Sequence, residues 1–287
     1  TKRFTVSQAR HLTSLVLILS LVHELLKLNK TVNIREVYYY FVTHFRNQRE
    51  CDAAIIEVSK LLQVPRQCLN LVASSRGWMY GNVQVYRNGI AALDAVASCP
   101  VTHEWLAPTE FDITVSENIC CILVIEKEGI YQRFVQDKIL SNAILITGKG
   151  FPDLATRAAV YKLHSILQLP VFGLADCDPF GVLVLQSYAS GPHAVPIRWL
   201  GLRPSQVKHL QHHHQLPDAV FQELSALDRK RLETLMEETH PFAISAPGRL
   251  DELEAMQDSK VELEALHWLG LEFCGNFVTK LLEYTVR

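Results

Sequence analysis

Three nearly continuous apolar runs in the middle of the chain most constrain its fold. They cover residues 119–125, 143–147 and 171–175, and helical stretches at 131–140 and 153–167 separate them. Short apolar runs that alternate with helices are typical of buried parallel strands joined by crossover helices. Residues 111–287 are therefore predicted to form an α/β domain with a Rossmann-like parallel sheet and helical elements toward its C-terminal end.

The first part of the chain has a different pattern. Helical periodicity covers residues 8–29 and 34–45, and a third helix is predicted over 52–62. Short strands at 71–74 and 83–86 follow it. Three helices and a small hairpin are the order of a CAP-like winged-helix domain, which we predict for residues 1–110. Such a domain commonly binds DNA, but it also serves as a protein-docking module.

The distribution of charged residues along the chain favours DNA binding more than the net charge does. The formal net charge is -2, but residues 223–264 hold 11 of the 30 acidic and only 5 of the 28 basic residues. The rest of the chain therefore carries a net +4. Residues 58–93 contain four basic residues and no acid, among them Arg66 and Arg76. A positive face of this kind can bind phosphates, although an ordinary solvated surface explains the charges as well.

Neither a membrane segment nor a cysteine framework is expected. The most apolar stretch, residues 15–28, contains Ser20, His23, Glu24 and Lys27 and is shorter than the roughly 20 residues that span a bilayer. It is predicted to pack against protein. The seven cysteines form no CxxC pair, which argues against a zinc finger and a disulfide framework and favours a reducing intracellular compartment.

Acidic residues directly follow two of the predicted strands. Glu126 comes after the run at 119–125, and Asp176 and Asp178 come after the run at 171–175. Ligands of open parallel sheets bind at the carboxyl ends of the strands, so the three carboxylates can converge there. Three oxygen ligands suit Mg²⁺ or Mn²⁺. The alternative is that the aspartates merely cap a helix that begins at Pro179.

A tyrosine-rich segment is a candidate for nucleophilic catalysis. Arg35 and Tyr39 are four residues apart and share one face of the predicted helix. A tyrosine hydroxyl ordinarily has a pKa of about 10, so at neutral pH it must be activated by a neighbouring group to act as a nucleophile. A guanidinium one turn away can stabilise the tyrosinate or hold a phosphate. The alternative is that the three adjacent tyrosines belong to the core.

Two further motifs are judged not to be functional. The Gly148-Lys149 pair lacks the P-loop's preceding glycine, because position 143 is Ala, so no nucleotide hydrolysis is expected. His209, His212 and His213 could share one helical face, but no carboxylate or cysteine completes a metal site, and an exposed polar turn is the favoured interpretation.

Five blocks, taken together, resemble the meiotic double-strand-break transesterases (the Spo-eleven family) and the related A-type chain of topoisomerase VI. They occur in the same order and spacing between about residues 30 and 190: Arg35-Glu36-Val37-Tyr38-Tyr39, Gly81-Asn82-Val83, Val124-Ile125-Glu126-Lys127-Glu128, the block from Gly148 to Arg157, and Asp176-Cys177-Asp178-Pro179-Phe180-Gly181. Glu36 stands where Asp is common in the family, and Tyr40 where a small polar residue is frequent. Neither change removes a catalytic group.

The resemblance implies a winged-helix domain followed by a Toprim domain and a type IIB topoisomerase-like transesterase. It makes Tyr39 the nucleophile, with Arg35 beside the attacked phosphate. It assigns Mg²⁺, for which Mn²⁺ can substitute, to Glu126, Asp176 and Asp178. DNA contacts are expected at Lys149, Phe151 and Arg157, and, from the basic residues noted above, at Arg66 and Arg76. No organic cofactor is expected.

The resemblance also implies partners and a location. Double-stranded DNA is the expected substrate, and cleavage of both strands requires a homodimer or a heterodimer with a paralogue. A topoisomerase VI B-like partner is expected at the N-terminal helix, no membrane partner is expected, and the nucleus is the expected compartment. The favoured function is break formation that initiates meiotic recombination. The alternatives are a topoisomerase VI component of the A type that works with an ATPase partner, and a non-catalytic DNA-binding scaffold.

Overall fold

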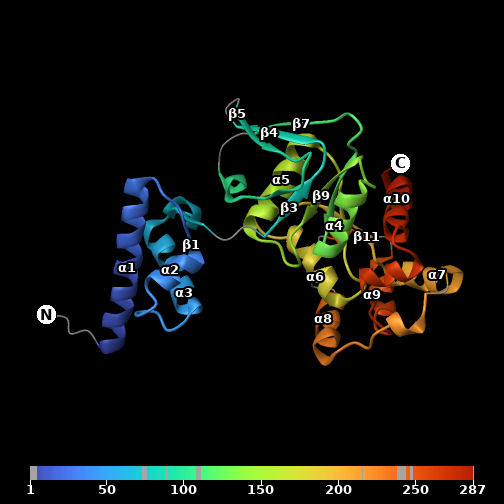
Figure 1. The fold of residues 1–287 in the computed structure, drawn as a ribbon. Coiled ribbons are helices and arrows are strands. Elements are labelled where there is room, and N and C mark those ends of the chain that lie inside the picture. The colour runs from blue at the N-terminus through green and yellow to red at the C-terminus, as the bar shows by residue number, and fades with distance from the viewer. Residues whose placement is uncertain are drawn as a thin grey trace. The chain divides into compact units, whose positions relative to one another are not determined.

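A computed structural model describes residues 5–72, 76–87, 90–107, 111–214, 216–237, 244–245 and 248–286. The chain forms two compact units, Thr1–Ser74 and Ser75–Arg287 (Figure 1). Each unit has its own hydrophobic core. The described residues of the segment 76–107, which the sequence assigned to the N-terminal domain, belong to the second unit, because two of its strands join the large sheet of that unit.

The N-terminal unit is mainly helical. Its elements are α1 (Val6–Leu28), β1 (Val32–Asn33), α2 (Ile34–Tyr40), α3 (Gln48–Leu62), the 3-10 helix η1 (Arg66–Leu69) and β2 (Leu71–Val72). Thr5 begins α1 with a capping box, and Asn29 ends it in the left-handed conformation. Side chains from α1, α2 and α3, among them Ile18, Val37 and Ile55, form the core of this unit.

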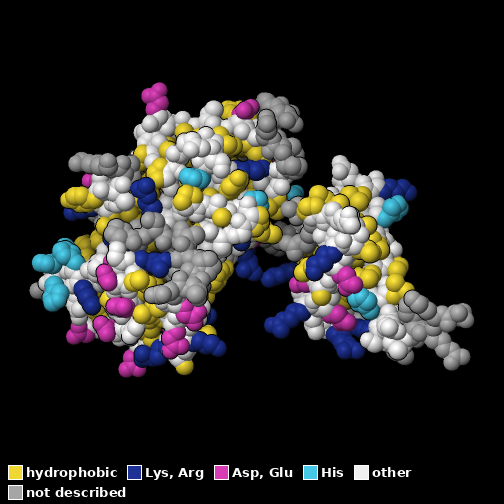
Figure 2. Space-filling model, turned by 180° about the vertical axis from the view of Figure 1, so that it is seen from behind, with side chains coloured by type: hydrophobic (Ala, Val, Ile, Leu, Met, Phe, Trp, Pro, Cys, Tyr) yellow, Lys and Arg dark blue, Asp and Glu magenta, His cyan; other side chains and the backbone are white. Residues whose placement is uncertain are grey.

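Helix α1 is apolar on more than the face that it buries. By length and composition alone, Ser7–Leu28 would suffice to cross a membrane. In the structure, Ile18, Val22 and Leu25 are buried in the protein core, as the sequence predicts for a helix that packs against protein. Leu12 and Val16 are about half exposed, and hydrophobic side chains are visible on the surface of this unit (Figure 2).

Within the described residues, the two strands that the sequence predicted as the hairpin of a wing do not pair with each other. The first two residues of the predicted strand 71–74 form β2, which pairs in parallel with β1, and residues 73–74 lie outside the described ranges. The other predicted strand is β4 (Val83–Arg87), which pairs with β5 (Ile90–Asp94) and β7 (Asp112–Val115) in the second unit. Local alternation indicated both strands, but it carries no information about their partners.

A seven-stranded mixed sheet is the centre of the second unit, in the order β12-β11-β10-β8-β9-β3-β6. The strands are β3 (Trp78–Tyr80), β6 (Cys99–Pro100), β8 (Cys121–Ile125), β9 (Ala143–Thr147), β10 (Val171–Leu174), β11 (Ile197–Gly201) and β12 (Ile244–Ser245). The five strands from β12 to β9 are parallel, while β3 and β6 are antiparallel additions at one edge. The predicted parallel sheet is thus present.

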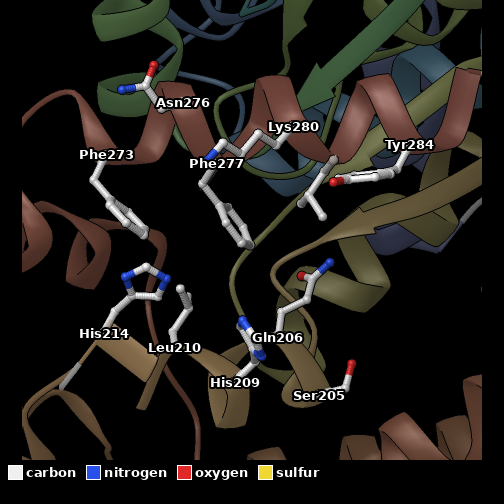
Figure 3. A pocket seen from close by; sticks show the side chains of 11 residues that line it. Ser205, Gln206, His209, Leu210, His214, Phe273, Asn276, Phe277, Lys280 and Tyr284 are labelled. Atoms are coloured by element: carbon white, nitrogen blue, oxygen red, sulfur yellow. The ribbon is translucent and has the colours of Figure 1, made fainter. Parts of the chain in front are cut away.

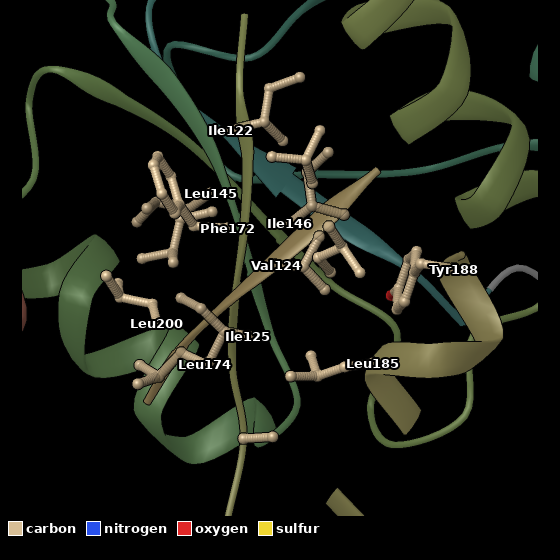
Figure 4. Close-up of a cluster of buried hydrophobic side chains, with 14 of the residues drawn as sticks. Ile122, Val124, Ile125, Leu145, Ile146, Phe172, Leu174, Leu185, Tyr188 and Leu200 are labelled. Atoms are coloured by element: carbon tan, nitrogen blue, oxygen red, sulfur yellow. The ribbon is translucent and has the colours of Figure 1, made fainter. Parts of the chain in front are cut away.

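Helices connect and cover the strands. The crossovers are α4 (Glu128–Asp137), α5 (Leu154–Leu167) and α6 (Pro179–Tyr188); then come α7 (Pro204–His214), α8 (Ala226–Met236), α9 (Arg249–Ala255) and α10 (Phe273–Val286). Every residue of β8, β9 and β10 is buried, since helices pack on both faces, and their side chains meet in the core that Figure 4 shows. Short 3-10 helices occur at His103–Leu106, Asp218–Val220 and Leu263–Leu269.

Candidate active site

Two neighbouring parallel strands bring the predicted acidic residues together. Strands β8 and β10 are paired so that Ile125 lies opposite Leu174. Glu126 and Asp176, which follow those strands, are only 4% and 5% exposed. The backbone N–H of Asp176 donates a hydrogen bond to Oε2 of Glu126 over 3.0 Å. The two carboxyl groups are therefore neighbours at the carboxyl edge of the sheet.

Asp178 has the capping role that the sequence left open as an alternative. It is the N-cap of α6, with Pro179 in the first turn, and its Oδ1 accepts a hydrogen bond from the Gly181 N–H over 2.6 Å. A Cβ atom at Gly181 would lie 2.7 Å from the carbonyl oxygen of Asp176 and 3.0 Å from Oε2 of Glu126. Only glycine leaves room at this position for the Glu126 carboxylate.

The environment disfavours three ionised carboxylates. Burial and then the neighbouring Asp176 raise the pKa of Glu126 to about 7. Burial also raises the pKa of Asp176 to about 6, against the lowering effect of the Leu263 N–H and of Lys127. The pKa of Asp178 is raised by burial too, although its bond from Gly181 opposes the shift. Neighbouring carboxylates contribute to the raised pKa values of Glu126 and Asp176, because too little positive charge lies nearby to offset their repulsion.

One lysine and a distant segment complete the surroundings of Asp176. Nζ of Lys127 lies 3.0 Å from Oδ2 of Asp176, 3.2 Å from Glu264 and 3.4 Å from Glu262. The backbone N–H of Leu263 donates to Oδ1 of Asp176 over 2.8 Å. The sequence patterns did not predict these contacts. Lys127 stands directly after Glu126 in a family block, but nothing local indicates that residues 262–264 return to the site.

The donor chemistry fits a hard divalent cation, because the three side chains offer only oxygen atoms and two of them are nine-tenths buried. Their present arrangement does not yet enclose one. Within the described ranges, no group of three His, Cys, Asp or Glu side chains is close enough around one point to hold a metal ion. Asp178 is engaged as the cap of α6, and Asp176 in its ion pair with Lys127.

Tyr39 lies in the N-terminal unit, on the short helix α2. Asn33 caps this helix by accepting a hydrogen bond from the Arg35 N–H, and Val37 anchors it in the core. Tyr39 is 70% exposed, whereas Tyr38 packs against the core. Arg35 is exposed as well, and its guanidinium has no hydrogen-bond or ion-pair partner among the described residues. The alternative in which all three tyrosines are core residues does not hold for Tyr39.

The predicted DNA contacts differ in their surroundings. Lys149 forms an ion pair with Glu128 at 2.7 Å, and Phe151, 44% exposed, packs edge-on against Phe180. The backbone N–H of Arg76 donates to Asp153, the N-cap of α5, and so lies close to the block from Gly148 to Arg157.

The other two predicted contacts are Arg157 and Arg66. The guanidinium of Arg157 donates to the carbonyl oxygen of Ser190 and is half-buried, so it would have to leave this bond to reach DNA. Arg66 begins η1, but its side chain is outside the part of the chain that the structure describes.

A pocket of about 540 Å³ lies apart from these residues, between α7 and α10 (Figure 3). His209 and His214 line it opposite Phe273 and Phe277, and none of the three carboxylates does. The rings of His209 and His213 are 4.3 Å apart at their centroids. These histidines are exposed, as the sequence predicts, but they belong to helix α7 and not to a turn.

Comparisons with known proteins match both units. Residues 121–280 match the family model of the Toprim domain shared by Spo11 and the A component of topoisomerase 6, and residues 10–71 match that of type IIB DNA topoisomerase. The chain is 30% identical over 276 residues to the meiotic recombination protein SPO11 of Mus musculus, with 89% of this chain and 67% of that protein covered.

Plant proteins of two kinds are similarly close. Identity is 32% with the meiotic recombination protein SPO11-1 of Oryza sativa subsp. indica, over 93% of this chain and 72% of that protein. It is 30% with the A component of DNA topoisomerase 6 of Arabidopsis thaliana, over 94% of this chain and 65% of that protein. The match of residues 10–71 includes Tyr39, and that of 121–280 includes the three carboxylates.

Proposed function

The chain belongs to the family of Spo11 proteins and topoisomerase 6 A components, and we propose that it cleaves double-stranded DNA with Tyr39 as its nucleophile to initiate meiotic recombination. The observation that carries the proposal is the exposure of Tyr39. Its side chain is 70% accessible, and it stands four residues from an exposed arginine without a partner among the described residues. A buried tyrosine could not reach a phosphate.

The proposed reaction exchanges one ester for another. Oη of Tyr39 forms a bond to the phosphorus of a DNA phosphodiester, and the bond from phosphorus to the 3′ oxygen breaks. The phenol loses its proton and the 3′ oxygen gains one, so a 5′-phosphotyrosine and a 3′ hydroxyl result. Arg35, one helical turn away, would hold the attacked phosphate through its guanidinium. Because the ester bond is conserved, cleavage consumes no nucleotide.

Glu126, Asp176 and Asp178 would hold Mg²⁺, or Mn²⁺ in its place. The bound ion would neutralise the phosphate charge that otherwise repels a tyrosinate. The burial and the raised pKa of Glu126 and Asp176 support this assignment, since a divalent cation would relieve the repulsion among the carboxylates. The fixed strand ends would orient the ligands, and the Gly181 position would keep space for the Glu126 carboxylate.

The partners follow from the stoichiometry of the cut. One chain supplies one Tyr39 and one set of carboxylates, so a double-strand break requires two chains, as a homodimer or with a paralogue. In this proposal, the tyrosine of one protomer meets the metal of the other, and a monomer is inactive. The half-exposed apolar residues of α1 would bind a topoisomerase VI B-like partner. Chromosomal DNA as substrate makes the nucleus the site of action.

Covalent adduct formation tests the proposal. The protein is incubated with double-stranded DNA and Mn²⁺ or Mg²⁺ at concentrations that allow self-association, denatured, and analysed for DNA attached to protein. Wild type should form adducts, and Tyr39→Phe and Glu126→Ala should not. Tyr40→Phe is the matched control, because Tyr40 is equally exposed at 69% on the same helix. Adducts that persist in Tyr39→Phe, or vanish equally in Tyr40→Phe, would refute the assignment.

A second candidate is the role of the A component in a topoisomerase VI, favoured by the 30% identity to the Arabidopsis thaliana protein of that kind. Such a protein would reseal its breaks when an ATPase partner is present. Relaxation of supercoiled DNA after addition of a B-type partner and ATP would support this candidate over meiotic break formation. A permanent break in the same assay would support the first.

A further inference from the structure

We propose that Lys127 is a built-in counter-cation of the acidic site: it neutralises Asp176 while no divalent ion is bound, and it moves toward Glu262 and Glu264 when an ion binds. The inference rests on the proposed function, because it assumes that the ion binds at Glu126, Asp176 and Asp178. It assigns Lys127 a role in positioning and in control of ion binding, and it gives residues 262–264 a part in the site.

Both carboxylate oxygens of Asp176 already have partners. Oδ1 accepts the backbone N–H of Leu263 over 2.8 Å, and Oδ2 lies 3.0 Å from Nζ of Lys127. A divalent ion on Asp176 needs one of these oxygens. The Leu263 N–H belongs to the backbone and cannot turn away, whereas Lys127 has a flexible side chain. Oδ2 is therefore the oxygen that can be released.

Two cations cannot share Oδ2 without strong repulsion, because the group is buried and screening by water is weak there. Lys127 has another place at hand. Its Nζ is already 3.2 Å from Glu264 and 3.4 Å from Glu262. Both glutamates are about half exposed, so they can receive the ammonium group with little further desolvation. Rotation of one side chain suffices, and no backbone movement is required.

Residues 260–264, which carry Glu262 and Glu264, are held beside the acidic site by backbone hydrogen bonds. Val261 and Cys177 exchange backbone hydrogen bonds of 2.9 and 3.1 Å, and Lys260 and Gln222 exchange two of 2.9 Å. Cys177 stands between the two aspartates of the site. The backbone that carries Glu262 and Glu264 therefore keeps a fixed position relative to Asp176, so the fold holds both glutamates within reach of Lys127.

The inference is tested by Mn²⁺ binding to the full chain without DNA, measured from the free-ion signal in electron paramagnetic resonance. Lys127→Met should lower the Kd for Mn²⁺ by roughly tenfold, because the competing charge is gone. Lys127→Arg should retain the wild-type Kd within a few-fold. Lys208→Met is the matched control, since it removes the same charge from the same unit at an exposed lysine that pairs with Asp258 and with none of the three carboxylates. Its Kd should change less than about twofold.

A double-mutant cycle separates the proposed movement from general electrostatics. The double substitution Glu262→Gln/Glu264→Gln should raise the Kd for Mn²⁺ more when Lys127 is present than when it is replaced by Met. The reason is that the glutamates favour ion binding by taking up the lysine side chain. An equal effect in both backgrounds would show that they act only by their charge, and it would overturn the movement of Lys127 toward them.

A second readout is thermal denaturation. Without metal, Lys127→Met should unfold at a lower temperature than wild type, since Asp176 loses its partner, and saturating Mn²⁺ should restore much of the difference.

The outcomes distinguish this inference from the proposed function. Mn²⁺ binding by wild type with an unchanged Kd in Lys127→Met would overturn the counter-cation role and leave the metal site standing. Binding by neither protein would overturn the metal site and the inference with it. Binding by Lys127→Met alone would support the inference in its strongest form.

Discussion

The backbone N–H of Asp176 donates to the Glu126 carboxylate over 3.0 Å, across two strands whose last residues lie opposite each other. The spacing of these acids is thus set by the register of β8 and β10 rather than by flexible side chains. Among the described residues, the buried Glu126 carboxylate accepts this one backbone hydrogen bond, and its raised pKa indicates that it remains short of positive charge. Its response to pH, to added volume and to divalent ions can therefore be predicted.

In the absence of divalent ions, the protein should lose stability as pH rises from about 4.5 to about 7. Burial and Asp176 raise the pKa of Glu126 to about 7 in the folded state, so the folded protein binds more protons than the unfolded one in this window. The stability that protonated Glu126 contributes is fully present below the pKa of this group in the unfolded state. It is lost as pH rises through the pKa in the folded state. Glu126→Gln should flatten the decline and stabilise the metal-free protein at pH 8 by roughly 1–3 kcal/mol.

Urea denaturation in the presence of a chelator, repeated across this range, measures the effect. Added Mn²⁺ should remove the decline in wild type and have little influence on Glu126→Gln. A wild-type stability that rises steadily from pH 5 to pH 8 would contradict the raised pKa.

Gly181→Ala should weaken metal binding and destabilise the second unit by about 1–3 kcal/mol, because the new methyl group would collide with the Asp176 carbonyl and crowd the Glu126 carboxylate. Gly129→Ala is the control. A Cβ atom there meets nothing within 4 Å, and alanine favours the helix that contains it. Thermal denaturation and Mn²⁺ titration of both variants check the prediction, and equal behaviour of the two would exclude steric crowding at Gly181.

Lys149 and Phe151 should affect DNA binding in different ways. Lys149→Ala should weaken binding and reduce the slope of log K against log salt concentration by about 0.9, as expected for one lost phosphate contact. Phe151→Ala should weaken binding with the slope unchanged, because an exposed ring contributes by stacking and not by charge.

Fluorescence anisotropy at several salt concentrations gives both quantities. Lys208→Ala, at an exposed lysine paired only weakly with Asp258 at 3.8 Å, controls for general loss of charge. The same slope in wild type and Lys149→Ala would remove Lys149 from the DNA contacts.

The exposed face of α1 should be required for the partner and not for folding. Leu12→Asp and Val16→Asp lie on one face, four residues apart, and should abolish binding of a B-type partner while leaving the unfolding temperature nearly unchanged. Ile18→Ala, in contrast, empties a fully buried position and should cost about 2–4 kcal/mol. Co-purification with the partner, together with thermal denaturation, tests this. Partner binding that survives both aspartate substitutions would assign the partner to another surface.

Much of the second unit was predictable because its strands are short, apolar and separated by helices. The run at 143–147 coincides with β9, and the helical stretch predicted at 153–167 matches α5 to within one residue at each end. Pairing across long sequence distances was not predictable. Strand β3 pairs antiparallel with β9 and lies between β9 and the edge strand β6, and β4 pairs with β7, although local alternation suggested a hairpin in the N-terminal domain.

The same limit applies to the site. Glu126 and the two aspartates were found because acids after buried strands collect at one edge of a parallel sheet. Asp178 as the cap of α6 follows from the Pro179 that succeeds it. The approach of Leu263 to Asp176 joins residues 87 positions apart, and no periodicity or motif encodes such a contact.

Because Tyr39 and Glu126 belong to separate units, each with its own core, loss-of-function alleles should fall into two biochemical classes. A core defect in the first 74 residues would abolish cleavage yet leave ion binding intact, and a defect around β8 would abolish ion binding, and cleavage with it, while the unit that carries Tyr39 stays folded. Mixed in one heteromeric pair, two such defective chains would still contain one sound tyrosine and one sound set of acids. Partial complementation between two such alleles would then show that the intact tyrosine of one chain works with the intact acidic residues of the other.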